Sequence, residues 1–369
     1  MPHDIISADC HLDPEYLPPE VFVERAPSAM KDRVPRVVEK DGASYWMAGD
    51  QTLGLWGPTY LKQNLARTRR GQAMLAAGFA EGLRPSDPDK RIEDMERDGV
   101  DAELIYGPLR RWKYMATVEP DLAQVVCSLY NEFMAELCAS RPGRFYALAA
   151  VPPDDLEAIV SEIAHAAELG LSGLEVSLHD PDRPAWDSYW DPLWEAAARH
   201  RLPVHIHIPA ARDRIAASTS LADRAAWMSS MPMNMGYTVA SIIFGGVLDR
   251  HPQAQVVMAE SGTGWIPYLL ARMDYEWEDS YDEWKNLTPN PPSEAFRRQV
   301  YATFQEDVAG PQLASMYPDN FLWGSDYPHL DGVWPDSAAI LEKTMGSLDP
   351  ALKRKMTRDN AAALYRMNV

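Results

Sequence analysis

Acidic and imidazole side chains stand at the ends of two apolar stretches that lie far apart in the chain. Asp9 and His11 close the run Ile5–His11, and Asp326 directly follows the run Phe321–Ser325. In an extended strand, side chains two positions apart point to the same face, so Asp9 and His11 share one face. Carboxylates and imidazoles presented together are typical ligands of divalent metal ions. The two runs therefore predict strands that direct ligands to one metal centre.

Two further apolar runs carry the same kinds of side chain. His205 and His207 belong to the run Pro203–Ile208, and Glu260 closes the run Gln255–Glu260. A lone histidine on a strand is more often a hydrogen-bonded core residue than a ligand, so the metal prediction rests on the convergence of several such groups. We expect His207 and Glu260 to bind metal and His205 to contact substrate.

Polar and apolar residues alternate strictly along the run Gly173–Leu178 and into His179. Alternation places Glu175, Ser177 and His179 on one face, and the opposite, apolar face should lie against helices. A buried carboxylate is costly unless it is paired or bound to metal. Glu175 is therefore predicted to be a metal ligand or a salt-bridge partner.

Eight short runs of this kind are predicted to be buried parallel strands. They are Ile5–His11, Ala102–Tyr106, Phe145–Ala150, Gly173–Leu178, Pro203–Ile208, Gln255–Glu260, Val300–Phe304 and Phe321–Ser325. Helix-patterned stretches lie between them, such as Asp154–Leu169, for which Asp154 is the expected N-cap. Repeated strand-then-helix order with right-handed crossovers predicts an α/β protein closed into a (β/α)8 TIM barrel.

A long segment, from about residue 12 to residue 101, separates the first two strands and is predicted to be an insertion. Within it, Arg36–Met47 has two strand-like runs around an Asp-Gly turn, which predicts a hairpin. Trp46 in the insertion, and Trp227 in the loop after the fifth strand, are expected to line an apolar substrate site. Residues 1–369 are predicted to form a single domain.

The composition limits the classes of function. The 369 residues are 46% hydrophobic and carry a formal net charge of −19, which disfavours nucleic acid and anionic membranes as partners. The cysteines, Cys10, Cys127 and Cys138, form no Cys-x-x-Cys pair and are expected to be free thiols in a reducing cytoplasm. No apolar run is long enough to span a bilayer, and the N-terminus lacks an export pattern, so a cytoplasmic protein is expected.

The chain resembles the amidohydrolase superfamily and, within it, the amidohydrolase-2 branch of aminocarboxymuconate semialdehyde decarboxylase-like metal-dependent hydrolases. The resemblance spans nearly the whole chain and rests on the order of several short motifs. These are Asp9-Cys10-His11, Asp94-Met95, Asp98-Gly99-Val100-Asp101-Ala102, Ala150-Val151-Pro152, Trp190-Asp191-Pro192-Leu193-Trp194, His207, Gly262-Thr263-Gly264-Trp265-Ile266-Pro267-Tyr268 and Gly324-Ser325-Asp326-Tyr327-Pro328.

The resemblance implies that Asp9, His11 and His207 bind a metal ion and that Asp326 both holds the metal and handles a proton. This chain departs from the branch at the sixth strand, where the decarboxylases present a histidine and this sequence has Glu260-Ser261. The departure weakens the decarboxylase interpretation, while Glu260 offers a carboxylate ligand instead.

The expected donor set is rich in oxygen and contains no thiolate, so Fe(II) and Mn(II) compete with Zn(II) for the site. If Glu175 and Glu260 are both ligands, there are enough donors for two ions with a carboxylate between them. We therefore expect one or two divalent cations.

Our first hypothesis is a metal-dependent hydrolase, in which metal-bound hydroxide attacks the carbonyl of an amide, lactone, ester or thioester that has a bulky apolar part. Asp326 would be the base and proton carrier, and His179, His205 or His329 would add a hydrogen-bond donor that stabilises the developing charge. Of the two catalytic candidates His179 and His329, His329 is most simply interpreted as a residue that binds substrate or supports the metal ligands. The alternative is a carboxy-lyase acting without oxidation on an aromatic or unsaturated acid, with Arg111 as a candidate clamp for the substrate carboxylate.

A second alternative is an inactive barrel that serves as a binding protein, although retained metal ligands would have little use there. The expected partner is a small carbonyl compound, and the resemblance implies a homodimer.

Overall fold

The structure of this chain is a computed structural model, and it describes most of the sequence. The described residues are 4–57, 61–62, 65–79, 83–107, 119–153, 155–178, 182–208, 220–279 and 282–368. Of the predicted site residues, His179 and Arg111 lie outside these ranges.

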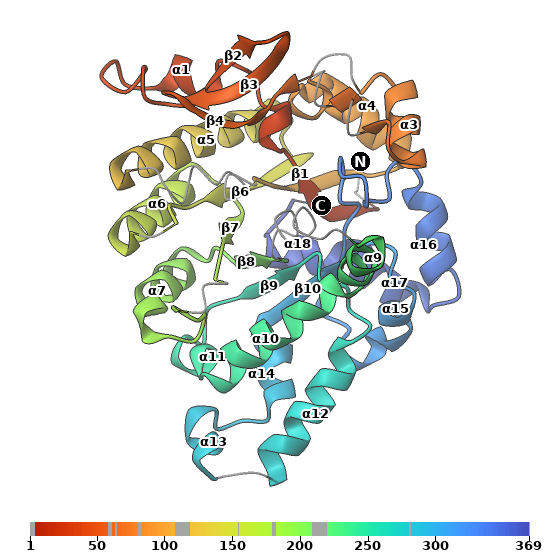
Figure 1. Ribbon diagram of the computed structural model, residues 1–369. Coiled ribbons are helices and arrows are strands. Elements are labelled where there is room, and N and C mark those ends of the chain that lie inside the picture. Colours follow the sequence, from red (N-terminus) through yellow and green to blue (C-terminus); the bar gives the residue numbers. More distant parts are fainter. Residues whose placement is uncertain are drawn as a thin grey trace. The chain divides into compact units, whose positions relative to one another are not determined.

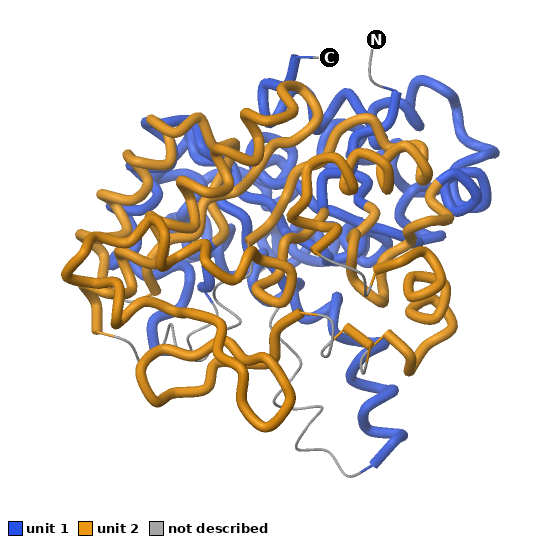
Figure 2. The backbone as a smooth tube through the Cα atoms, turned by 90° about the horizontal axis from the view of Figure 1, so that it is seen from above, with its two compact units in different colours: residues 1–9, 176–324, 338–369 blue, residues 10–175, 325–337 orange. Residues whose placement is uncertain are grey.

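The chain divides into two compact units (Figure 2). Unit 1 comprises Met1–Asp9, Val176–Gly324 and Ala338–Val369, and unit 2 comprises Cys10–Glu175 and Ser325–Ser337. The boundaries fall inside β1 and β7, in the loop after β11, and inside α16. That the whole chain forms a single domain stays a prediction.

Eight strands form one sheet in the order β1-β5-β6-β7-β8-β9-β10-β11, and the paired neighbours run parallel. The strands are β1 Ile6–His11, β5 Ala102–Tyr106, β6 Phe145–Ala150, β7 Gly173–Val176, β8 Val204–His207, β9 Val256–Ala259, β10 Val300–Phe304 and β11 Phe321–Trp323. Helices occupy the connections (Figure 1). The predicted (β/α)8 barrel is confirmed, because eight parallel strands alternating with helices define that fold.

Five of the eight predicted runs begin or end one or two residues beyond the strands that form. Glu260 is the last residue of one predicted run, and Asp326 directly follows another. Their φ values are positive, 54° for Glu260 and 55° for Asp326. A left-handed residue cannot continue a strand, so β9 ends at Ala259, directly before Glu260. β11 already ends at Trp323, before Gly324. These turns place both carboxylates in loops that follow the strands.

Unit 2 contains the insertion, and its predicted hairpin is confirmed. β2 (Arg36–Lys40) pairs antiparallel with β3 (Ala43–Ala48). Asp41 and Gly42 both have positive φ values, as a two-residue hairpin turn requires. A third strand, β4 (Gln51–Leu55), extends this sheet and was not predicted.

The other helices of unit 2 are α1 Val21–Arg25, α3 Arg69–Ala76, α4 Pro88–Asp98, α5 Pro120–Ser140 and α6 Leu156–Glu168, with short 3-10 turns η1 Pro14–Tyr16 and η2 Arg84–Ser86. The predicted helix after the third barrel strand is α6, but its N-cap is one residue later than expected. The side chain of Asp155 accepts hydrogen bonds from the backbone N–H groups of Glu157 and Ala158. Asp154 lies outside the described residues.

Unit 1 holds the remaining helices, which Figure 1 shows in green to blue. They are η5 Ser188–Trp190, α7 Asp191–His200, α9 Leu221–Ser230, η6 Met231–Asn234, α10 Met235–Phe244, α11 Val247–Arg250, α12 Ile266–Asp279, α13 Asp282–Leu287, α14 Pro292–Gln299, α15 Ala309–Leu313, η7 Ala314–Met316, α16 Ser337–Met345, α17 Pro350–Arg354, the π-helical turn η8 Lys355–Asp359 and α18 Asn360–Leu364. α16 begins at the last residue of unit 2.

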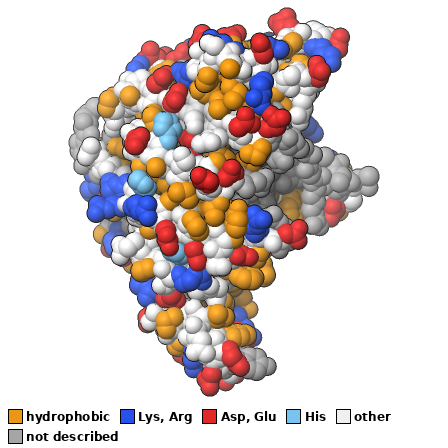
Figure 3. All heavy atoms as spheres, turned by 90° about the vertical axis from the view of Figure 1, so that its left-hand side faces the viewer, with side chains coloured by type: hydrophobic (Ala, Val, Ile, Leu, Met, Phe, Trp, Pro, Cys, Tyr) orange, Lys and Arg blue, Asp and Glu red, His pale blue; other side chains and the backbone are white. Residues whose placement is uncertain are grey.

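The surface fits the acidic composition. On the face in Figure 3, acidic side chains are spread among basic and apolar ones and do not gather in one field. None of the helices in the described ranges is both long and apolar enough to cross a membrane.

The three cysteines are free thiols, as the sequence predicted. Burial raises the pKa of the Cys138 thiol to about 12 and raises the pKa of Cys127 further.

Candidate metal centre

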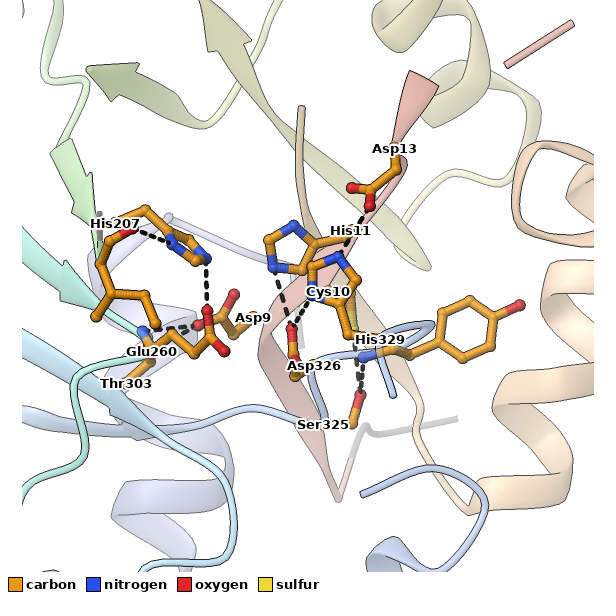
Figure 4. Close-up of polar contacts among 12 residues, drawn as sticks. Asp9, Cys10, His11, Asp13, His207, Glu260, Thr303, Ser325, Asp326 and His329 are labelled. Carbon is orange, nitrogen blue, oxygen red and sulfur yellow. Dashed lines mark hydrogen bonds and ion pairs between the residues drawn. The ribbon is translucent and has the colours of Figure 1, made fainter. Parts of the chain in front are cut away.

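Within unit 1, the ends of four strands bring together two carboxylates, an imidazole and a hydroxyl (Figure 4). Oδ2 of Asp9 accepts hydrogen bonds from Oγ1 of Thr303 at 2.6 Å and from the backbone N of Glu260 at 3.1 Å. A carboxylate oxygen of Asp9 and a ring nitrogen of His207 lie within 4.8 Å of each other. Oε2 of Glu260 lies 3.2 Å from Nε2 of His207. The group is buried, and it contains the predicted ligands Asp9, His207 and Glu260.

Strand register explains why Glu260 reaches His207. His207 pairs with Ala259 across β8 and β9, so Glu260 is the next residue along the neighbouring strand. With a φ of 54°, Glu260 leaves the alternation of β9, at a cost of roughly 1 to 3 kcal/mol for a residue other than glycine. Backbone strain of this size persists only where surrounding contacts hold it, and here it accompanies the contact with His207.

Within unit 2, Asp326 lies between two imidazoles (Figure 4). Its Oδ1 is 3.2 Å from Nε2 of His11 and 2.9 Å from Nδ1 of His329. The other ring nitrogen of His329, Nε2, is 3.0 Å from Oδ2 of Asp13. His329 therefore contacts two carboxylates that are both buried, those of Asp326 and Asp13. Asp13 was not among the predicted site residues.

The His11 and His329 rings are stacked, with centroids 4.0 Å apart and an interplanar angle of 27°. Donor atoms of His11, Asp13 and His329 lie within 4.8 Å of one another. Nitrogen lone pairs lie in the plane of an imidazole ring, so two stacked rings do not direct them to one point between the rings. We therefore assign His329 to the hydrogen-bonding surroundings of Asp326 and not to a second metal site.

A buried network holds the loop that carries Asp326. The backbone N of His11 donates to the carbonyl of Tyr327 at 2.6 Å, and Nη1 of Arg91 donates to the carbonyl of His11 at 3.1 Å. The hydroxyl of Tyr327 donates to Oδ2 of Asp94 at 2.8 Å. Burial, followed by the charge of Asp94, raises the pKa of Tyr327 well above its usual value, so the hydroxyl stays a donor. The Asp94-Met95 motif thus fixes α4 to the Asp326 loop.

Glu175 lies at the end of β7 in unit 2, buried as expected. Its Oε2 accepts a hydrogen bond from the backbone N of Gly107 at 3.2 Å. A Cβ atom at Gly107 would lie 2.1 Å from the hydroxyl of Tyr130, so only glycine fits beside Glu175. The role of Glu175 as a metal ligand stays a prediction.

The remaining predicted residues differ in their surroundings. His205 is fully buried, stacks on Tyr365 with centroids 5.6 Å apart, and is neutral because burial lowers its pKa to about 3. Trp46 is also fully buried: its Nε1 donates to the carbonyl of Pro14 at 2.7 Å, and its ring packs against Phe22. In these contacts Trp46 packs the insertion; its contact with a substrate stays a prediction.

Trp227 is half-buried on α9, a helix with no buried side chain among its residues. A contact between Trp227 and substrate stays a prediction, as does such a contact for His205. His179 and Arg111 lie outside the described residues, so the catalytic role of His179 and the substrate clamp of Arg111 stay predictions.

Sequence reasoning missed Thr303 as well as Asp13. Thr303 is a polar residue inside the otherwise apolar run Val300–Phe304, and this was the only signal for it. Asp13 continues the two-residue spacing of Asp9 and His11, which was an available signal.

The donor atoms within each unit suit a divalent cation. Asp9 belongs to the group in unit 1 and His11 to the group in unit 2. Each group combines carboxylate oxygens with imidazole nitrogens and lacks a thiolate, which suits Mn(II), Fe(II) or Zn(II).

Comparison with known proteins finds relatives of this chain. The chain is 24% identical over 302 residues to gamma-resorcylate decarboxylase from Polaromonas sp., covering 76% of this chain and 87% of that protein. It is 27% identical over 249 residues to 2-amino-3-carboxymuconate-6-semialdehyde decarboxylase from Dictyostelium discoideum, covering 66% of this chain and 67% of that protein.

The fold is also that of a solved structure, 5-carboxyvanillate decarboxylase from Novosphingobium aromaticivorans with bound manganese and a nitrobenzoic acid. The TM-score is 0.71 at 18% identity, over 99% of this chain and 97% of that one. The Amidohydrolase family model matches residues 8–367. This chain therefore belongs to the Amidohydrolase family, as the ordered motifs predicted.

Proposed function

We propose that this chain is a metal-dependent decarboxylase that releases CO2, without oxidation, from an aromatic or unsaturated carboxylic acid. The observation that carries the proposal is the position of Asp326, a buried carboxylate in contact with two imidazoles. The named relatives support it, because both are decarboxylases. This reverses the order of the sequence hypotheses, because among the comparisons hydrolysis has support only from family membership, whereas the named relatives favour the carboxy-lyase alternative.

Asp9, His11, His207 and Asp326 would hold the metal ion. A divalent cation supplies a Lewis acid, which would polarise a substrate oxygen and stabilise the negative charge that develops during the reaction. Manganese in the related structure supports Mn(II) as the first ion to test.

Asp326 would handle the proton. When the bond between carbon and the carboxylate breaks, CO2 leaves and the carbon keeps the electron pair, so that carbon needs one proton. Asp326 would give this proton as a general acid. Nδ1 of His329, 2.9 Å from Oδ1, would return a proton to Asp326, and the contact of His329 with Asp13 orients the ring for this transfer.

Hydrolysis of a neutral carbonyl compound is the second candidate, and Glu260 favours it. Oε2 of Glu260 lies 3.2 Å from Nε2 of His207. The family resemblance implies a histidine at this position in the decarboxylases, and this chain has Glu260 there instead. A carboxylate there repels an anionic substrate, whereas an ester, lactone, amide or thioester carries no charge to repel. The decarboxylase proposal requires that the cation offset this repulsion.

The experiment loads the metal-stripped protein with Mn(II), Fe(II) or Zn(II) and offers aromatic and unsaturated acids beside a panel of esters, thioesters, lactones and amides. We expect CO2 release that depends on metal and is lost in Asp326→Asn, a change that removes the proton carrier but little volume. Acid formation from the acyl panel without CO2 release would establish the hydrolase instead. If the purified protein takes up no metal, both enzyme hypotheses are excluded and the inactive barrel that serves as a binding protein remains.

A further inference from the structure

The hydroxyl of Thr303 joins three strands of unit 1 at their carboxyl ends. Thr303 lies on β10, accepts a hydrogen bond from the backbone N of Glu260 after β9 at 2.7 Å, and contacts Oδ2 of Asp9 on β1 at 2.6 Å. Thr303 and Asp9 have no exposed surface, and they are 294 positions apart in the sequence. A single buried hydroxyl therefore touches both a predicted metal ligand and the backbone of another.

The directions of these hydrogen bonds follow from the chemistry of the groups. A backbone N–H only donates, so Oγ1 of Thr303 accepts from Glu260. The one hydroxyl proton then points to Oδ2 of Asp9, where it is donated to the carboxylate. Oδ2 receives two donors in all, Thr303 and the N–H of Glu260. These bonds fix the rotation of the Asp9 carboxylate and commit one of its oxygens to the protein.

The same hydroxyl holds Glu260 in a strained conformation. The backbone of Glu260 has a φ of 54°, and its N–H is bonded to both Thr303 and Asp9. This backbone places the Glu260 carboxylate 3.2 Å from Nε2 of His207. Two hydrogen bonds from the Glu260 N–H stabilise this strained backbone, and loss of the Thr303 hydroxyl removes the shorter of them.

We infer that Thr303 is a positioning residue for metal binding: it sets which oxygen of Asp9 faces the cation and holds Glu260 beside His207. This inference rests on the metal site of the proposed function. Groups that orient metal ligands through hydrogen bonds typically change metal affinity about 10- to 100-fold when removed.

The test is the Mn(II) dissociation constant, measured by competition with a chromogenic chelator, for wild type and three variants. Thr303→Val keeps the shape but removes the hydroxyl, and we expect its Kd to rise at least about tenfold. Thr303→Ser keeps the hydroxyl and should bind Mn(II) within about threefold of wild type. Thr288→Val is the matched control, because Thr288 is equally buried in unit 1 and donates to Asp249 at 2.8 Å.

Thr288→Val should lower the Tm and leave the Kd unchanged, which separates positioning from general stability. If Thr303→Val does not fold, Thr303→Cys replaces it, since a thiol is a weak donor and should also raise the Kd. A Kd equal to wild type in folded Thr303→Val, or in its Cys substitute, would overturn the inference. Wild type that binds no Mn(II), Fe(II) or Zn(II) would instead refute the proposed function.

Discussion

The hydroxyl of Tyr327 donates a hydrogen bond to Oδ2 of Asp94 at 2.8 Å, and both side chains are buried. Asp94 also receives Nε and Nη2 of Arg84, and the ring of Tyr327 lies under the guanidinium of Arg91. Tyr327 directly follows Asp326 in the chain. The contact therefore ties α4, at the end of the insertion, to the carboxylate that we assign to proton transfer.

Replacement of Tyr327 by Phe should lower the free energy of unfolding by about 1 to 3 kcal/mol, because the buried carboxylate of Asp94 loses a donor. Tyr130→Phe is the matched control. Tyr130 is equally buried, but among the described residues its hydroxyl has no hydrogen-bond partner, so its removal should be neutral or slightly stabilising. Urea unfolding of both variants measures the difference. Equal losses would contradict a specific role for the Tyr327–Asp94 bond.

Asp98 gives a pH dependence of stability. Burial raises its pKa to about 6, although the N–H and hydroxyl of Ser337 both donate to its carboxylate. A folded-state pKa above the unfolded value means that the native protein holds a proton that the unfolded chain has released. Its contribution to stability therefore falls as the pH rises from about 4 to about 6, by up to roughly 3 kcal/mol, and then levels off.

Asp98→Asn removes this titration. We expect the difference in free energy of unfolding, wild type minus variant, to fall between pH 4 and pH 7. In this difference the contributions of the carboxylates that both proteins share cancel. Denaturant titrations at four or more pH values within this window give the curve. A difference that stays flat would show that Asp98 does not titrate there.

Asp13→Asn tests the link through His329. An amide keeps the size of the side chain but removes the charge that orients the imidazole, so we expect kcat to fall about 10-fold to 100-fold. The fall should be smaller than in Asp326→Asn, which removes the proton carrier itself. Steady-state kinetics and circular dichroism on both variants decide this. A wild-type kcat in folded Asp13→Asn would exclude Asp13 from the proton path.

Glu175→Gln tests whether Glu175 is a metal ligand. The amide still offers an oxygen to the N–H of Gly107, so the fold should survive, but the charge is lost. If Glu175 binds metal, the variant holds less metal per chain by elemental analysis. Metal content equal to wild type would make Glu175 a structural residue and would argue against a second ion.

The local pattern of the sequence was enough to predict the strands and to identify candidate metal ligands. Short apolar runs that end in Asp9, His11, His207 and Glu260 are visible without a structure, since side-chain direction alternates along a strand. The Asp41-Gly42 turn likewise predicts its hairpin, because the required positive φ values suit these two residues.

Other features were decided only by the tertiary structure. Thr303 meets Asp9 across 294 positions, Asp94 meets Tyr327 across 233, and Asp13 meets His329 across 316. The turn at Glu260 and the burial of Trp46 belong to the same class. Each depends on the register of strands and loops that are distant in the chain, and register follows from how whole elements pack, which no local spacing of residues encodes.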